Sequence, residues 1–158
     1  MNFAKPMALV TGASHGIGRE LAKHFAENGF DLIVTARGDL SQATSELTGL
    51  GASVESIELD LAAADGVDLL WRKVQSVGRP LAAAAINAGR GGGGAFATDT
   101  DLADELEIVD LNVRSTVHLA KHVVGDMVAR GEGRILFTSS IASAMPGSFQ
   151  AVYNASKS

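Results

Sequence analysis

The sequence predicts an α/β protein: a doubly wound parallel sheet in three layers, with helices on both faces. Short apolar runs alternate along the chain with longer segments whose apolar residues recur three to four positions apart, which is the spacing of a helix face. The connections are short, and strands that alternate with helices form right-handed crossover units with parallel strands. The run 31–35 is largely apolar, as expected of a strand covered on both faces.

The first half of the chain is predicted to contain three strands, each followed by a helix. The strands are expected at 7–11, 31–35 and 53–59, and the helices at 17–28, 41–50 and 62–77. Helical spacing predicts that one face of the first helix is buried, and Gly29 is expected to end this helix. The residues of that face are Ile17, Leu21, Ala22 and Phe25. In the third helix, Trp71 is interpreted as a packing residue beside Val67, Leu70 and Val74.

The second half begins with a strand at 81–86, where Pro80 is acceptable because it precedes the strand. Residues 87–94 include four consecutive glycines, which predict a mobile loop at the strand end. A helical region is expected at 101–109 and 113–130, then a strand at 134–138 and the start of a helix at 152–158. The sequence shows neither an internal repeat nor a second-domain linker, so residues 1–158 are expected to form a single domain.

Composition excludes several classes of function. The 158 residues contain no cysteine, so a disulfide framework and a thiolate zinc site are excluded. The formal net charge is −5 and the basic residues are scattered, which argues against a nucleic-acid surface. Because no run of 18 apolar residues occurs, no membrane span is expected. The N-terminus lacks the apolar core of a signal peptide, and a cytoplasmic location is the default expectation.

The stretch from Thr11 to Gly18 predicts a phosphate-binding turn between the first strand and the first helix. Gly12 permits a tight turn, Gly16 leaves room for a pyrophosphate, and Gly18 lets the helix pack against the strand. The free N–H groups at the start of the helix then face the phosphates. The cofactor-binding residues expected in this loop are Gly12, Ser14, His15, Gly16, Ile17 and Gly18.

Further motifs follow in a fixed order. Asp60-Leu61 comes after the third strand, Asn87-Ala88-Gly89 after the fourth, and Asn112 lies in the long helical region. Ser140 precedes Tyr153 by thirteen residues, and Tyr153 precedes Lys157 by four. Together with the glycine loop, these motifs resemble the short-chain dehydrogenase/reductase family over Met7 to Ser158. One departure is Ile86, which stands where the family's Asn-Asn-Ala-Gly motif has its first Asn.

The resemblance implies a Rossmann-like fold and an NAD(P)-dependent oxidoreductase that acts on a secondary alcohol or a ketone. In the family, the positions of Asp60 and Leu61 lie near the adenine, and those of Asn87, Ala88 and Gly89 border the cofactor. Asp60 has an alternative interpretation, because the same carboxylate could cap the next helix.

The chemistry expected of Tyr153 and Lys157 follows from their spacing. Residues four apart lie on one face of a helix. A free tyrosine has a pKa near 10, and a neighbouring ammonium group lowers that pKa toward neutrality. Tyr153 is therefore expected to exchange the substrate proton. The resemblance implies that Lys157 also holds the nicotinamide ribose and that Asn112 holds a water. It further implies that Ser140 orients the substrate oxygen; Ser139 is the competing candidate for this role.

The end of the second strand predicts the choice of cofactor. NAD sites place an acidic residue there, whereas NADP sites use arginine for the 2′-phosphate. Ala36 occupies the acidic position and Arg37 follows, so NADP(H) is preferred over NAD(H). His15 adds a weak positive charge, and Asp39 opposes the preference slightly.

The chain stops one residue after Lys157, whereas the family's chains continue. The resemblance implies that two further strands and the substrate-binding segment lie beyond Ser158. The fifth strand is then expected to be an exposed edge, and residues 1–158 alone to be a poor catalyst. The resemblance also implies that the full-length form is a homo-dimer or homo-tetramer, built on the helix 112–130 and on the helix that starts at Val152. Three alternatives remain open: a non-catalytic dinucleotide-binding module, an inactive fragment of a longer enzyme, and the related nucleotide-sugar epimerases, whose glycine spacing usually differs.

His118 and His122 are four residues apart on one predicted helix, a spacing that metal sites use. Because no third ligand lies at a useful spacing in the sequence, a surface or packing role is favoured, and no metal site is predicted.

Overall fold

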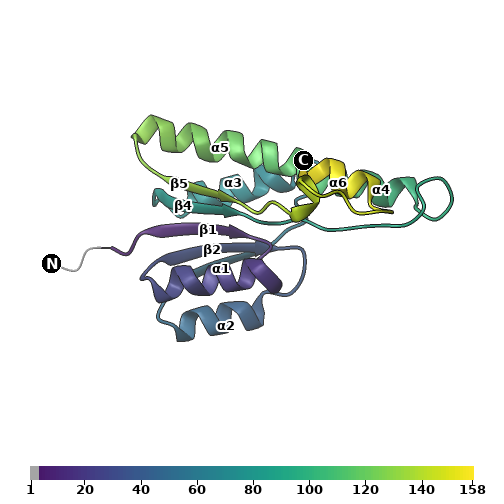
Figure 1. Ribbon diagram of the computed structural model, residues 1–158. Coiled ribbons are helices and arrows are strands. Elements are labelled where there is room, and N and C mark those ends of the chain that lie inside the picture. The colour runs from purple at the N-terminus through teal and green to yellow at the C-terminus, as the bar shows by residue number, and fades with distance from the viewer. Residues whose placement is uncertain (1–3) are drawn as a thin grey trace.

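The computed structural model describes residues 4–158. In this range five parallel strands form one sheet in the order β3-β2-β1-β4-β5 (Figure 1). The strands are β1 (Met7–Thr11), β2 (Asp31–Ala36), β3 (Val54–Glu58), β4 (Leu81–Ile86) and β5 (Arg134–Phe137). The predicted doubly wound parallel sheet is confirmed, since the chain winds outward from β1 to β3 and then crosses back to β4.

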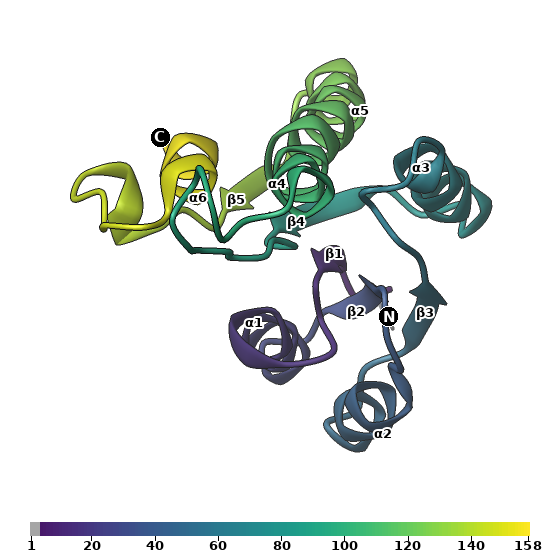
Figure 2. The same ribbon diagram turned by 90° about the vertical axis from the view of Figure 1, so that its right-hand side faces the viewer.

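Helices cover both faces of the sheet, with α1 and α2 on one side and α3 and α5 on the other (Figure 2). Their bounds are α1 (Gly16–Glu27), α2 (Ser41–Gly49), α3 (Gly66–Ser76), α4 (Leu102–Val109), α5 (Ser115–Arg130) and α6 (Ala151–Lys157). A π-helical turn, Asp110–Arg114, joins α4 to α5, and a 3-10 turn, Ile141–Ser143, precedes α6. None of the helices among residues 4–158 is long and apolar enough to cross a bilayer.

The central strands supply both halves of the core. Every residue of β1 and β2 is buried, and successive side chains of a strand point to opposite faces. Ala8 and Val10 therefore pack toward α1 and α2, whereas Met7 and Leu9 pack toward α3 and α5. This two-sided burial explains why the sequences of β1 and β2 are largely apolar.

The predicted burial of Ile17 is wrong, because its side chain is 64% exposed. The buried residues of α1 are Gly18, Ala22 and Ala26, a stripe that starts one position later. A Cβ on Gly18 would lie 2.1 Å from the carbonyl oxygen of Gly12. The helix backbone at Gly18 thus touches the turn after β1, and this approach rotates Ile17 toward solvent.

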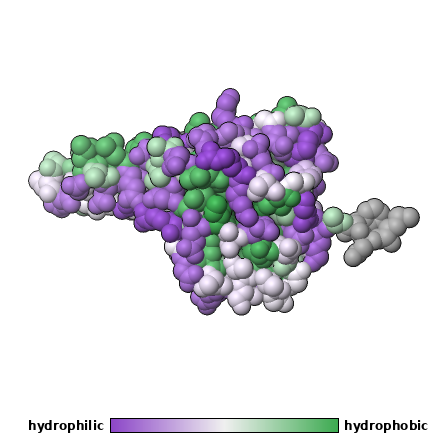
Figure 3. Space-filling view, turned by 180° about the vertical axis from the view of Figure 1, so that it is seen from behind, coloured by the Kyte–Doolittle hydropathy of each residue, from purple (hydrophilic) through white to green (hydrophobic). Residues whose placement is uncertain are grey.

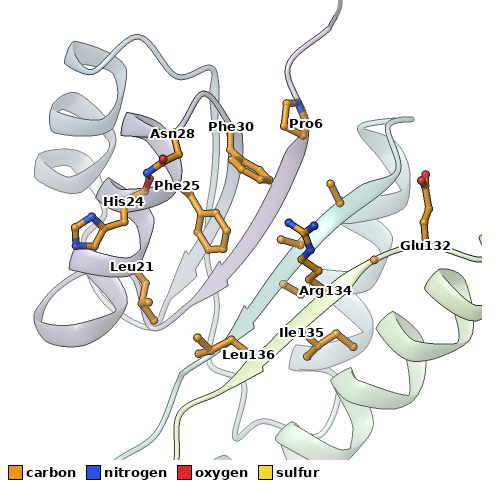
Figure 4. Close-up of a pocket in the computed structure, with 14 residues that line it drawn as sticks. Pro6, Leu21, His24, Phe25, Asn28, Phe30, Glu132, Arg134, Ile135 and Leu136 are labelled. Atoms are coloured by element: carbon orange, nitrogen blue, oxygen red, sulfur yellow. The ribbon is translucent and has the colours of Figure 1, made fainter.

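The β5 side of the molecule is more open. Three of the four residues of β5 are exposed, in line with the expected edge strand. A hollow of about 790 Å³ lies between β5 and α1, and Figure 4 shows Phe25, Phe30 and Leu136 pointing into it. Exposed apolar side chains also gather on the projecting part that contains α4 and α6, at the left in Figure 3; they include Phe96, Leu102, Leu106, Met145 and Phe149.

Candidate functional site

The turn between β1 and α1 has the backbone that its glycines suggested. Gly12 and Gly16 have φ angles of +71° and +56°, which residues with a side chain rarely adopt. A Cβ on Gly12 would lie 3.0 Å from the Cα of Ala88, so the turn also presses against the segment after β4. His15 occupies the N-cap position of α1, and its side chain makes no capping hydrogen bond to the first turn of the helix. The backbone N–H groups of that turn are therefore available to an anion.

Asn87 joins the ends of three strands. Its backbone N–H and that of Ala88 each donate to Oγ1 of Thr11, both at 2.9 Å. The Asn87 side chain donates from Nδ2 to the Thr11 carbonyl at 3.0 Å and accepts from Oγ1 of Thr138 at 2.8 Å. The motif after β4 therefore fixes the carboxyl ends of β1, β4 and β5 relative to one another.

A pocket of about 760 Å³ opens at this carboxyl edge, where the strand order reverses between β1 and β4. Doubly wound sheets bind their ligands at such a reversal. The predicted cofactor residues that line the pocket are Gly12, Ser14, His15, Arg37, Asp60, Leu61, Ala88 and Gly89. Gly16, Ile17 and Gly18 lie at the adjoining start of α1 rather than in the lining.

Arg37 is engaged in an ion-pair network that the sequence did not reveal. Its side chain is 66% exposed, and Nη1 lies 2.5 Å from Oε1 of Glu107 and 3.8 Å from Oδ2 of Asp60. The second carboxylate oxygen of Glu107 accepts from Arg90. Arg90 in turn lies 3.5 Å from Asp104. Glu107 thus bridges two arginines at the mouth of the pocket.

Two acidic residues of the pocket lining are held by local hydrogen bonds. Asp60 Oδ1 accepts from the Ala62 N–H at 2.9 Å, which closes a turn, while Asp65 occupies the N-cap position of α3. The capping alternative for Asp60 is thus corrected to a turn before the helix. Hydrogen bonds from the N–H and the hydroxyl of Ser41 hold the pKa of Asp39 below its ordinary value. Asp39 is therefore ionised at neutral pH.

Asn112 lies at the centre of the second part of the site. It is buried in the π-helical turn, and its Oδ1 accepts from the Arg90 N–H at 2.9 Å. Its Nδ2 donates to the Arg90 carbonyl and to Oγ of Ser156, both at 2.9 Å. One side chain therefore joins the glycine-rich loop, the α4–α5 connection and α6.

Lys157 and Tyr153 approach the same glycine-rich loop from α6. The Lys157 Nζ donates to the Thr138 carbonyl at 3.3 Å. A Cβ on Gly89 would lie 3.1 Å from Asn112 Oδ1 and 3.3 Å from Lys157 Nζ, and a Cβ on Gly91 would lie 3.9 Å from the Tyr153 ring. Short α6 thereby brings Lys157 and Tyr153 to the loop that also contacts Asn112.

The two candidate serines occupy different surroundings. Ser139 lines a small pocket of about 150 Å³ together with Asn112, Ser156 and Lys157. The Ser140 Oγ accepts from the Ala142 N–H at 3.1 Å and so caps the 3-10 turn. Both serines lie within three residues of the end of β5.

Sequence reasoning missed Glu107 and Arg90. Glu107 lies seventy residues from Arg37 on α4, and neither its type nor its spacing marks it in the sequence. Arg90 follows the Asn-Ala-Gly motif directly, and its position beside that motif was the one available signal.

Comparisons with known proteins agree with this geometry. The short chain dehydrogenase family model matches residues 6–158. The 3-oxoacyl-acyl-carrier-protein reductase FabG of Escherichia coli is 31% identical over 158 residues, which cover 99% of this chain and 64% of that protein.

Two solved structures have the same fold. A variant of actinorhodin polyketide ketoreductase with NADPH superposes with a TM-score of 0.89 at 33% identity, covering 97% of this chain and 60% of the other. L-sorbose reductase from Gluconobacter frateurii, complexed with NADPH and L-sorbose, superposes with a TM-score of 0.89 at 30% identity, covering 98% and 59%.

The chain spans about three fifths of the length of curated relatives that it matches, for example 62% of an oxidoreductase of Bacillus subtilis. Within that span the match runs from the strand before the glycine turn to α6. The chain therefore belongs to the short-chain dehydrogenase family.

Proposed function

We propose that this chain forms a single dinucleotide-binding domain that transfers a hydride between NADP(H) and a secondary alcohol or ketone. The observation that carries the proposal is that both groups of candidate residues lie along the carboxyl edge of the sheet. The glycine turn and Arg37 lie around one pocket at this edge. At the adjoining segment after β4, Asn112, Tyr153 and Lys157 approach Gly89 and Gly91. A phosphate-binding end and a proton-exchanging end are thus joined through residues 87–91.

Each side chain has a role in the proposed reaction. The nicotinamide cofactor, when bound, supplies or accepts the hydride. In the direction of reduction, Tyr153 donates its phenolic proton to the substrate oxygen, and the Lys157 ammonium favours the phenolate that remains. Ser140, with Ser139 as alternative, donates a hydrogen bond to the same oxygen. Asn112 positions α6 through Ser156 and orients the glycine-rich loop through the backbone of Arg90.

Arg37 is proposed to select NADP(H). Its guanidinium is exposed at the end of β2, and planar guanidinium groups bind phosphate through paired hydrogen bonds. Its present partner Glu107 is shared with Arg90, so Arg37 can turn to a phosphate while Glu107 remains paired. The two structural neighbours described above contain NADPH, which supports the same choice.

The first test is a titration of the 158-residue chain with NADPH and with NADH, followed by nicotinamide fluorescence. Wild type is expected to bind NADPH more tightly. Arg37→Ala is expected to weaken NADPH binding about tenfold, the value of one charge-assisted phosphate contact, and to leave NADH unchanged. Arg72→Ala is a matched control on the exposed surface of α3. Near-equal affinities for the two cofactors in wild type contradict the NADP(H) preference.

The second test concerns catalysis. Tyr153→Phe keeps the ring and removes the proton, so ketone reduction by NADPH should fall at least about a hundredfold while NADPH affinity stays the same. Tight NADPH binding without turnover of any ketone, both in residues 1–158 and in a chain that continues beyond Ser158, contradicts the enzymatic proposal and favours a dinucleotide-binding module.

We also propose that the chain forms homo-oligomers through α5. Val117, Val124 and Val128 are 58%, 42% and 73% exposed and recur at helical spacing on this helix, which is the pattern of a buried helix contact. Sedimentation of wild type should give a dimer or larger species, and Val124→Lys should shift it toward the monomer. A monomeric wild type contradicts this proposal.

A further inference from the structure

A cluster of three metal-ligating side chains lies outside the pocket described above. His118 and His122 occupy successive turns of α5, and Asp68 lies in the first turn of α3. The two helices lie side by side on the same face of the sheet (Figure 2). The fold thereby brings Asp68 to the two histidines as a third possible metal ligand, which the spacing in the sequence did not indicate.

The three groups are close enough to share one ion. Asp68 Oδ1 lies 3.2 Å from His118 Nε2 and 3.5 Å from His122 Nε2. One ligand atom from each side chain lies within 4.8 Å of the others. Ligand atoms about 2.1 Å from a tetrahedral zinc ion are about 3.4 Å apart. The two Asp68 separations agree with that value, and the two histidine ligand atoms lie within 4.8 Å of each other.

Packing holds the His122 ring in place. The ring stacks on Trp71 with a centroid distance of 5.1 Å and an interplanar angle of 14°. The His122 Nε2 is buried and has no hydrogen-bond partner among residues 4–158. An unpartnered buried nitrogen costs free energy, and a metal ion would satisfy it.

We propose that Asp68, His118 and His122 bind one divalent transition-metal ion, with Zn²⁺ as the reference ion and water in the remaining position. Two imidazoles and one carboxylate are ligands that suit Zn²⁺ rather than Mg²⁺ or Ca²⁺. The side chains of all three residues are between 31% and 47% exposed, so the cluster borders solvent although the His122 Nε2 atom itself is covered. The bound ion would join α3 to α5 at His118, which lies six residues after Asn112.

The cluster offers a direct spectroscopic test. Trp71 is the chain's one tryptophan and contacts His122, so Co²⁺ binding should quench its fluorescence and produce a visible absorption band. Isothermal titration with Zn²⁺ should give one ion per chain. His118→Gln, His122→Gln and Asp68→Asn should each weaken Zn²⁺ binding at least about tenfold and abolish the Co²⁺ band.

His24→Gln is the matched control, because His24 pairs with Glu27 at 3.3 Å on α1 and lies outside the cluster. Circular dichroism and the melting temperature without metal check that each variant folds. Zn²⁺ affinity equal in wild type and in His118→Gln overturns the proposal, and so does a wild type that shows neither Zn²⁺ heat nor Co²⁺ quenching. Either result would mean that the cluster is an ion pair only.

Discussion

The β1–β2 half and the β5–α6 half of this protein contain the same kinds of element but are held by different forces. All residues of β1 and β2 are buried, whereas β5 is mostly exposed and α6 has no buried residue among those described. The α6 segment depends on polar contacts such as Asn112–Ser156 and Lys157–Thr138. The proposed phosphate-binding end is thus preorganised by packing, and the proposed proton-exchanging end by a few hydrogen bonds.

The largest expected effect lies at a crowded backbone position of the packed half. Gly18→Val should destabilise the fold by about 3 kcal/mol or more, because even a Cβ would lie 2.1 Å from a backbone oxygen. Urea unfolding measures this loss. Gly125→Ala is the control: an added Cβ on α5 meets open space and should stabilise by about 0.5–1 kcal/mol. Equal effects of the two substitutions would contradict the packing argument.

A matched pair of leucines compares the two halves directly. Leu9→Ala removes a fully buried side chain of β1 and should cost about 2–5 kcal/mol. Leu136→Ala removes a side chain of β5 that is 44% exposed, and its cost should stay below about 1 kcal/mol. A cost for Leu136→Ala as large as that for Leu9→Ala would show that β5 is covered in solution.

Asn112→Ala tests the polar attachment of α6. It removes three hydrogen bonds, each worth about 1 kcal/mol, so a loss of about 3 kcal/mol is expected. Hydrogen exchange should show faster exchange in α6 while β1 and β2 stay protected. Asn28→Ala, which loses one exposed bond to the His24 carbonyl, should change stability by less than about 0.5 kcal/mol. Unchanged exchange in α6 would refute the attachment.

The smallest expected effect is a dependence of folding stability on pH, caused by Asp31 at the start of β2. Burial raises the pKa of Asp31, but hydrogen bonds from the Ser53 N–H and from Arg79 outweigh it and hold the pKa below 3.8. The folded form therefore binds the proton less readily than the unfolded form, and stability is lost as pH falls through the folded pKa. Urea midpoints between pH 7 and pH 3 should decline less steeply in Asp31→Asn than in wild type. Parallel curves would contradict the role of Asp31.

Local patterns predicted much of this molecule, and long-range contacts explain the rest. Apolar runs and helical spacing located all five strands among the described residues, and the two-sided burial of β1 and β2 leaves a direct mark on their composition. The burial of Ile17 was mispredicted because the contact between Gly18 and Gly12 rotates α1. The glycine turn and the Tyr153–Lys157 spacing were readable as local motifs, whereas the Arg37–Glu107 ion pair joins residues seventy positions apart. Asp68 likewise meets His118 only through helix packing.

The π-helical turn at Asp110–Arg114 acts as an inserted residue in an otherwise continuous helix. Successive residues of an α-helix are rotated by about 100°, so one additional residue changes the rotational phase between α4 and α5. Glu107 can therefore face the arginines while His118 faces α3. Deleting a single residue from this turn would restore a uniform helix and turn one of these two faces away from its partners. The register of one short turn thus couples the orientation of both candidate sites.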